Sequence, residues 1–148
     1  MASYLTTVRS AIVTAVTGLT TTGSNVYQDE PYPLTATQVP ALVVSCWSPS
    51  IGFASMDAST LQVDVDIGVE CIAKGASGLA ATLDTIATEV QIALAAVTSI
   101  GSRAVKIAPV SIDRPVYELT TDQPVARRLL LYRIAPLFTT SADPTSLA

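Results

Sequence analysis

Apolar residues recur every three or four positions in two stretches of the chain, which is the spacing of one helix face. In residues 3–18 that face carries Leu5, Val8, Ile12 and Val16, and Leu19 follows them. Residues 77–99 carry a longer stripe, and Gly101 is the expected stop; the stripe comprises Leu79, Leu83, Ile86, Val90, Ala93, Leu94 and Val97. We predict two helices, the second about 33 Å long at about 1.5 Å per residue and able to cross a whole sheet.

Strict alternation of apolar and polar residues marks residues 60–73 as a β-strand with one buried face. The buried face is expected to carry Leu61, Val63, Val65, Ile67, Val69 and Cys71, and the other face Gln62, Asp64, Asp66, Gly68 and Glu70. Strand-like runs also occupy residues 25–28, 41–47, 105–112 and 125–138, with Pro109 expected at a bulge or an edge. In the last run one face carries Leu130, Tyr132, Ile134 and Phe138, and the other carries Arg127, Leu129, Leu131 and Arg133.

The order of these elements predicts an α+β fold. A mainly antiparallel sheet (order α-β-β-β-α-β-β) is expected to have two helices packed on one face. Residues 1–138 form a single α+β domain in this prediction, and residues 139–148 form a C-terminal tail that is frayed or docked on a partner. Prolines interrupt residues 29–40, and Pro49 with Gly52 is expected to break the strand that precedes it, so both segments are predicted to be long loops.

Composition adds a constraint on what surrounds the domain. The chain of 148 residues is 14% charged and 49% hydrophobic, whereas a typical domain is about 25% charged. Threonine, serine and alanine stand where lysine and glutamate are usual, which favours a surface covered by other protein; an ordinary domain from a source rich in threonine and alanine is the alternative. The net charge of −4 disfavours binding to nucleic-acid phosphates, and the sequence has no run of about 18 apolar residues to cross a membrane.

Few side chains in the sequence are suited to catalysis. The chain has no histidine, which removes the commonest general base and the commonest metal ligand. Cys46 and Cys71 lie in apolar runs without the spacing of a zinc or redox site, and we expect buried free thiols. These residue types therefore offer few candidates for a catalytic or cofactor-binding site.

The one dense carboxylate cluster is the row Asp64, Asp66 and Glu70 on the polar face of the long strand. Residues two apart on a strand are about 6.6–6.8 Å apart, so the row could flank a divalent ion. A solvated or partner-facing strand face is the simpler interpretation. If residues 125–138 form the neighbouring strand, Arg127 and Arg133 would make cross-strand ion pairs of about 0.2–1 kcal/mol that help to set the register.

Apolar side chains in the expected loops are candidate contacts with other proteins, because exposed aromatic residues and methionine are typical interface anchors. The main group is Trp47, Ile51, Phe53 and Met56, and the other two loops contribute Tyr32, Leu34, Tyr117 and Leu119. Folding back onto the core of the domain is the alternative for these side chains.

The succession of segments resembles that of a known family. The leading helix Val8-Arg-Ser-Ala-Ile-Val-Thr-Ala-Val precedes a Val-Tyr strand and a proline-rich loop that closes on Val39-Pro-Ala-Leu-Val-Val. A long alternating strand follows, then the helix Leu83-Asp-Thr-Ile-Ala-Thr-Glu-Val-Gln-Ile-Ala-Leu and the strand Arg127-Arg-Leu-Leu-Leu-Tyr-Arg. From about residue 4 to residue 138 this pattern resembles the tail terminator proteins (tail completion or neck proteins) of long-tailed bacteriophages.

The resemblance implies a structural subunit of a hexameric ring that caps the phage tail tube, ends its polymerisation and meets the head-side connector. It also implies no enzymatic activity and no cofactor. The implied partners are further copies of the chain, the tube protein and the connector protein, while DNA passes through without specific binding and no membrane takes part. The implied location is the tail or neck of the virion, after assembly in the host cytoplasm. Asp64, Asp66 and Glu70 would then be candidates for an acidic lining of the lumen.

Two other interpretations of the sequence stay open at this point. One is another head–tail joining protein of the virion, such as a head-closure or tube subunit. The other is a small α+β enzyme or ligand-binding domain that uses the carboxylate row with Mg²⁺.

Overall fold

The computed structural model describes residues 4–28, 40–53, 60–75, 77–100, 103–118 and 124–140. Its helices are α1 (Tyr4–Val16) and α2 (Leu79–Ala95). Its strands are β1 (Val26–Gln28), β2 (Ala41–Phe53), β3 (Thr60–Lys74), β4 (Ser99–Ile100), β5 (Arg103–Ala104), β6 (Ile107–Ile112), β7 (Val116–Glu118) and β8 (Val125–Thr140). Within these ranges neither helix has the length and apolar character needed to span a membrane.

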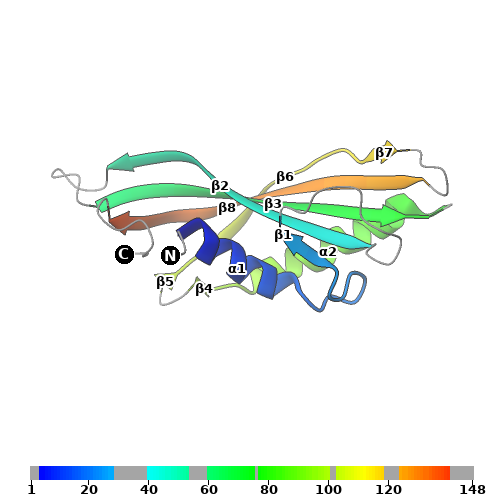
Figure 1. Ribbon diagram of the computed structural model, residues 1–148, viewed down its shortest axis with the longest axis horizontal. Helices are drawn as coiled ribbons and strands as arrows, with labels where there is room; N and C mark the ends of the chain where they lie inside the picture. Colours follow the sequence, from blue (N-terminus) through cyan, green and yellow to red (C-terminus); the bar gives the residue numbers. More distant parts are fainter. Residues whose placement is uncertain are drawn as a thin grey trace.

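The main sheet has the strand order β1-β2-β3-β8-β6, and β7 pairs with another part of β8. Its neighbouring strands are antiparallel except β1 and β2, which are parallel. Both helices lie on one face of this sheet (Figure 1). The predicted α+β architecture is therefore confirmed, whereas the β4–β5 hairpin, β7 and the parallel pair were not predicted.

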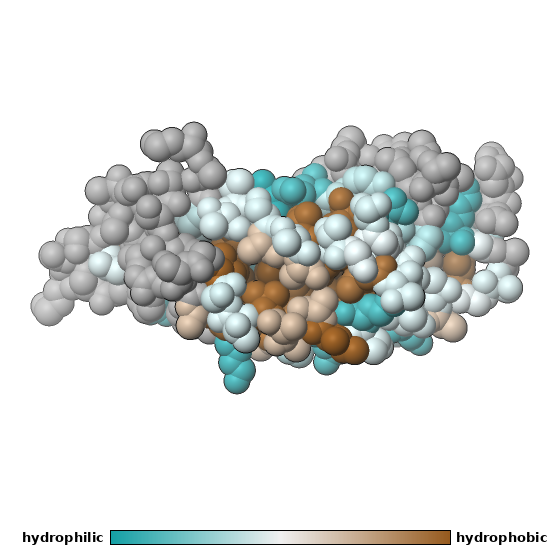
Figure 2. All heavy atoms as spheres, turned by 90° about the horizontal axis from the view of Figure 1, so that it is seen from below, coloured by the Kyte–Doolittle hydropathy of each residue, from teal (hydrophilic) through white to brown (hydrophobic). Residues whose placement is uncertain are grey.

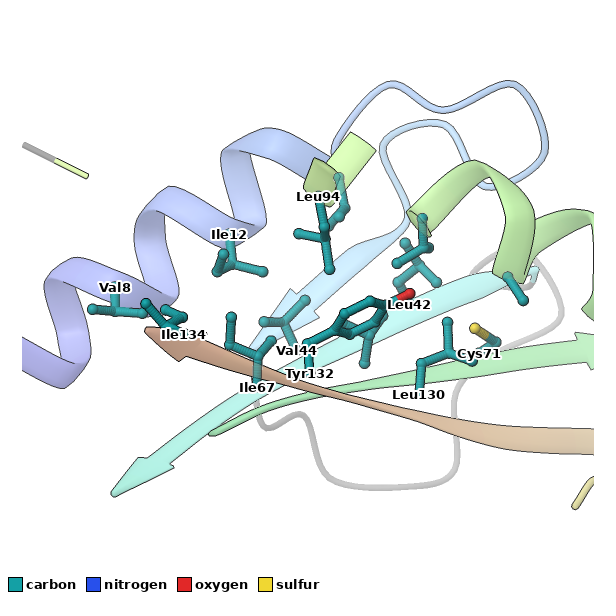
Figure 3. Packing of buried hydrophobic residues seen from close by; sticks show 14 of the residues in the cluster. Val8, Ile12, Leu42, Val44, Ile67, Cys71, Leu94, Leu130, Tyr132 and Ile134 are labelled. Carbon is teal, nitrogen blue, oxygen red and sulfur yellow. The ribbon is translucent and has the colours of Figure 1, made fainter. Parts of the chain in front are cut away.

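The core lies between the two helices and the sheet. From the helices it receives Tyr4, Val8, Ile12 and Val16 of α1, and Leu83, Ile86, Ala87, Val90 and Leu94 of α2. From the sheet it receives alternate residues of β3, with Leu130, Tyr132 and Ile134 of β8 (Figure 3). A fully buried Val, Leu or Ile side chain contributes about 1.5–3 kcal/mol of transfer free energy, so this layer supplies most of the stability. The helix faces and the strand alternation predicted from periodicity are confirmed here.

Each proline within a described strand lies at a shift of the strand register. The shifts involve Pro109 in β6, Pro49 in β2 and Pro136 in β8. A proline has no N–H to give to a neighbouring strand, so the residues left out of the pairing at a bulge suit it. Pro49 and Pro136 are such residues, whereas Pro109 is paired with Tyr132, next to the unpaired Val110 of the edge strand β6. The prediction for Pro109 is confirmed. The predicted strand break at Pro49 was wrong, because β2 continues through Phe53 and the Ser48 hydroxyl bridges the bulge by donating to the carbonyl oxygen of Asp64 (2.5 Å).

The bulge in β8 also changes which of its residues face the helices. Val65 pairs with Ile134, but Val63 pairs with Leu137, which is buried. The register pairs Phe138 with Gln62, and the prediction that the side chain of Phe138 shares the core face lies outside the described residues.

Helix α2 ends earlier than predicted, and strand β8 ends later. α2 ends at Ala95, where the Ala96 N–H donates to the carbonyl oxygen of Ile92 (3.3 Å), so the helix is about 26 Å long at about 1.5 Å per residue. The chain leaves the helix because Ser99 pairs with Ala104 in the β4–β5 hairpin. β8 continues to Thr140, two residues into the expected tail, and residues 141–148 lie outside the described residues.

Candidate functional site

The face of the main sheet opposite the helices, called the open face below, carries the polar positions of β3. The register places Trp47, Asp66 and Arg133 in one row across β2, β3 and β8. The next rows along β3 and β8 are Gly68 with Leu131 and Glu70 with Leu129. Figure 1 shows both helices on the other side of the sheet. A candidate interaction site here draws on three neighbouring strands.

The indole ring of Trp47 lies against β3 at Gly68. A Cβ atom on Gly68 would be 3.0 Å from Cζ3 and 3.2 Å from Cη2 of that ring. Both distances are shorter than ordinary van der Waals contacts, so the ring keeps this position because residue 68 has no side chain. Trp47 is 39% exposed, so it offers apolar surface from a position that the strand beneath it fixes. Sequence reasoning identified Trp47 but not the role of Gly68.

Arg133 and Asp66 form a two-pronged ion pair across β8 and β3. The Arg133 Nε donates to Asp66 Oδ1 (2.8 Å) and Nη2 donates to Oδ2 (3.2 Å). This hydrogen bonding and the negative charge of Asp66 raise the pKa of Arg133. Asp66 is buried while the side chain of Arg133 is half exposed, so the buried carboxylate orients a guanidinium that reaches the surface.

A second ionic group lies further along the same strands. Arg127 Nη1 is 3.5 Å from Glu70 Oε1, and Arg127 Nε is 3.4 Å from Glu118 Oε1 of β7. The predicted cross-strand pairing of Arg127 and Arg133 with the acidic row is thus confirmed, because β3 and β8 are neighbours in the sheet. No signal in the sequence indicated Glu118.

The ion pairs change what the carboxylate row can do. Asp66 and Glu70 face guanidinium groups, so two of the three carboxylates of the row are already paired where a divalent ion would need uncompensated carboxylates. In the described part of the chain no three His, Cys, Asp or Glu side chains are grouped so that they could hold a metal ion. The assignment of Asp64, Asp66 and Glu70 to a lumen stays a prediction.

The residues predicted as interface anchors do not form one patch. Trp47 is on the open face, whereas the bulge in β2 brings Ile51 opposite Val63, on the helix-covered side. Tyr117 belongs to β7 rather than to a loop, and it pairs with Ala126. Both Ile51 and Tyr117 are more than half exposed. The predictions for Tyr32, Leu34, Met56, Leu119 and the side chain of Phe53 lie outside the described residues.

The helix side of the molecule carries a second candidate surface. Figure 2, which views this side, shows apolar groups gathered over its middle. An open hollow of about 250 Å³ lies between the turn after α1 and the C-terminal half of α2, lined by Gly18, Leu19, Thr20, Glu89, Ile92 and Ala93. Ile92 is the most exposed large apolar residue in the described part of the chain, at 68%. The apolar periodicity of the sequence did not identify Ile92, because this residue lies outside the predicted buried face of the helix.

The two cysteines form no disulfide. Burial raises the pKa of the Cys71 thiol to about 12, which keeps it protonated and weakly nucleophilic near neutral pH. Burial also raises the pKa of Tyr132 to about 12. Both groups act as core side chains, as expected for Cys71 from its apolar run; Cys46, by contrast, is only half buried.

The sequence matches no protein-family model, and no curated protein matches it significantly. The proposed function therefore depends on the fold and on these two surfaces.

Proposed function

We propose that the chain is a structural virion protein, the tail terminator of a long-tailed bacteriophage, and that six copies form a ring. The ring would cap the tail tube, end its polymerisation and join it to the head-side connector. The succession of elements that carries the family resemblance supports this proposal. Helix α1, the short β1, the long β2–β3 pair, α2 and the arginine-bearing β8 follow one another in that order.

The observation that carries the proposal is the distribution of large apolar side chains around the described part of the chain. The exposed ones are Trp47, Ile51, Ile92, Val110, Ile112, Val116, Tyr117 and Leu129. They belong to several strands and to α2, so one partner on one side would leave many of them in water. In the proposed ring, each subunit contacts a further copy on either side, the tube below and the connector above. Contacts on all these sides would cover the exposed apolar side chains.

The ionic groups support the same interpretation. Arg128 pairs with Asp84, and Arg133 pairs with Asp66. Because these charges are engaged within the chain, covering the surface leaves few of them without a counter-charge.

The experiment that tests this proposal is co-expression with the tube protein of the same genome, followed by negative-stain electron microscopy. We expect tubes of limited length with a sixfold ring at one end, where the tube protein alone gives tubes of uncontrolled length. Tubes of unchanged length without a terminal ring would contradict the proposal.

A further inference from the structure

The outer face of α2, meaning Ala81, Asp84, Thr85, Thr88, Ile92 and Ala95, has little available charge. The whole helix contains two charged residues, Asp84 and Glu89, and no lysine or arginine. Asp84 pairs with Arg128 Nη1 (2.5 Å), and Glu89 Oε2 accepts a hydrogen bond from the Thr21 N–H (3.3 Å). A face without cations does not suit nucleic acid or an anionic membrane, both of which select lysine and arginine.

The threonines of this face also have their hydroxyl groups satisfied. Thr85 donates to the carbonyl oxygen of Ala81 and Thr88 to that of Asp84, each at 3.0 Å. A hydroxyl that already donates within its own helix costs less to remove from water, and its methyl group remains available for packing. Together with the exposed side chain of Ile92, this makes the outer face of α2 suited to contact with an uncharged protein surface.

The open face of the sheet has the matching character. Trp47 and Leu129 expose apolar surface there, and the arginines of the face are paired with Asp66 and Glu70. A sheet in a layered fold is normally covered by helices on the face it buries. The chain thus carries, on opposite sides (Figure 1), a sheet face whose arginines are paired with carboxylates and an outer helix face to which α2 contributes no lysine or arginine.

We propose that the outer face of α2 in one copy packs on the open face of the next copy. Two different surfaces of one chain meet in such a contact, so it repeats head to tail and closes into a ring when the rotation between copies permits. An unrelated partner would cover one of the two faces and leave the other in water, whereas a second copy covers both. The inference rests on the proposed ring and names the surfaces that form its lateral contacts.

Trp47→Lys on the open face and Ile92→Lys on α2 test the contact by sedimentation velocity at rising concentration. Lysine suits an exposed helix position and, at residue 47, stands beside Asp66, so both variants are expected to fold, which circular dichroism checks. Each variant alone should lose self-association, with a dissociation constant at least about tenfold higher than that of the wild type. A one-to-one mixture should form dimers but nothing larger, because one intact contact remains.

Ile112→Lys is the matched control, since Ile112 is exposed to a similar degree on β6 and belongs to neither surface. It should self-associate like the wild type. If Trp47→Lys does not fold, Leu129→Lys replaces it, because Leu129 is also on the open face and pairs with Glu70. Wild-type association by either single variant, a mixture that stays monomeric, or an equal loss in the control would overturn the inference.

The failure of this contact and the failure of the proposed function are distinguishable. Sixfold rings formed by Trp47→Lys and Ile92→Lys would overturn the contact and leave the ring standing. Wild-type chains that neither self-associate nor cap tubes would overturn both.

Discussion

At the scale of single residues, Gly68 determines how Trp47 is presented. The strand leaves room for the indole only because no Cβ atom projects from residue 68. Exposed apolar surface is thereby held in one orientation before any partner arrives, which lowers the entropy cost of binding.

Gly68→Ala is expected to displace the ring and to lower the free energy of unfolding by about 1–3 kcal/mol, the usual cost of an overpacked contact. The chain has one tryptophan, so its emission in the folded state should change as well. Gly52→Ala in β2 is the control, because nothing lies within 4 Å of a Cβ atom there. Urea unfolding followed by fluorescence measures both variants, and equal effects would contradict the packing of Trp47 on residue 68.

Burial distinguishes two of the ion pairs. Asp84 is mostly exposed (68% for its side chain), so Asp84→Asn should cost less than about 1 kcal/mol, as exposed pairs do. Asp66 is buried beneath Arg133, so Asp66→Asn should cost several times more, because the amide cannot accept both hydrogen bonds. Urea unfolding of both variants at low and high salt is the measurement. Salt should reduce the loss for Asp84→Asn more than that for Asp66→Asn, because it screens exposed charges, and a larger loss for Asp84→Asn than for Asp66→Asn would refute the assignment.

The buried thiol of Cys71 predicts a loss of stability in alkali. Its pKa is raised from 9.0 to about 12 in the folded chain. Above pH 9 the unfolded chain releases a proton that the folded chain keeps, so the free energy of unfolding falls by up to about 1.4 kcal/mol per pH unit. Below pH 9 this group gives no slope. Cys71→Ala should show a shallower decline than the wild type in urea unfolding across pH 9, and an unchanged slope would contradict the burial of the thiol.

At the scale of elements, periodicity predicted both helices and the long strands because their buried faces repeat over many residues. The bulges were visible only in part. Pro109 indicated one, but Pro49 was taken as a strand break, because the sequence does not show that Ser48 would bridge to Asp64. A shift of one residue then places Ile51 on the face opposite to the one that simple alternation gives.

The short elements escaped prediction for a different reason. β4, β5 and β7 span two or three residues each, which is too few to show an alternation of apolar and polar residues. Their pairing depends on where β8 and the end of α2 place them in space. The same holds for the candidate site: Trp47 and the cross-strand arginines were predictable from the sequence, while Gly68, Glu118 and Ile92 required the register and the helix orientation.

At the scale of the whole molecule, the low charge content of the sequence is reflected in two broad faces that have little available charge. The helices cover one face of the sheet, and their own outer side is as poor in available charge as the opposite face of the sheet. Such a domain is suited to repeated packing with copies of itself, which is the common basis of the proposed ring and of its lateral contact.

Native mass spectrometry of the wild-type chain over a rising concentration series tests this account most directly. The account predicts a concentration-dependent shift from the 15.4 kDa chain towards a closed assembly of six copies. A mass that stays at one chain throughout the series would contradict it.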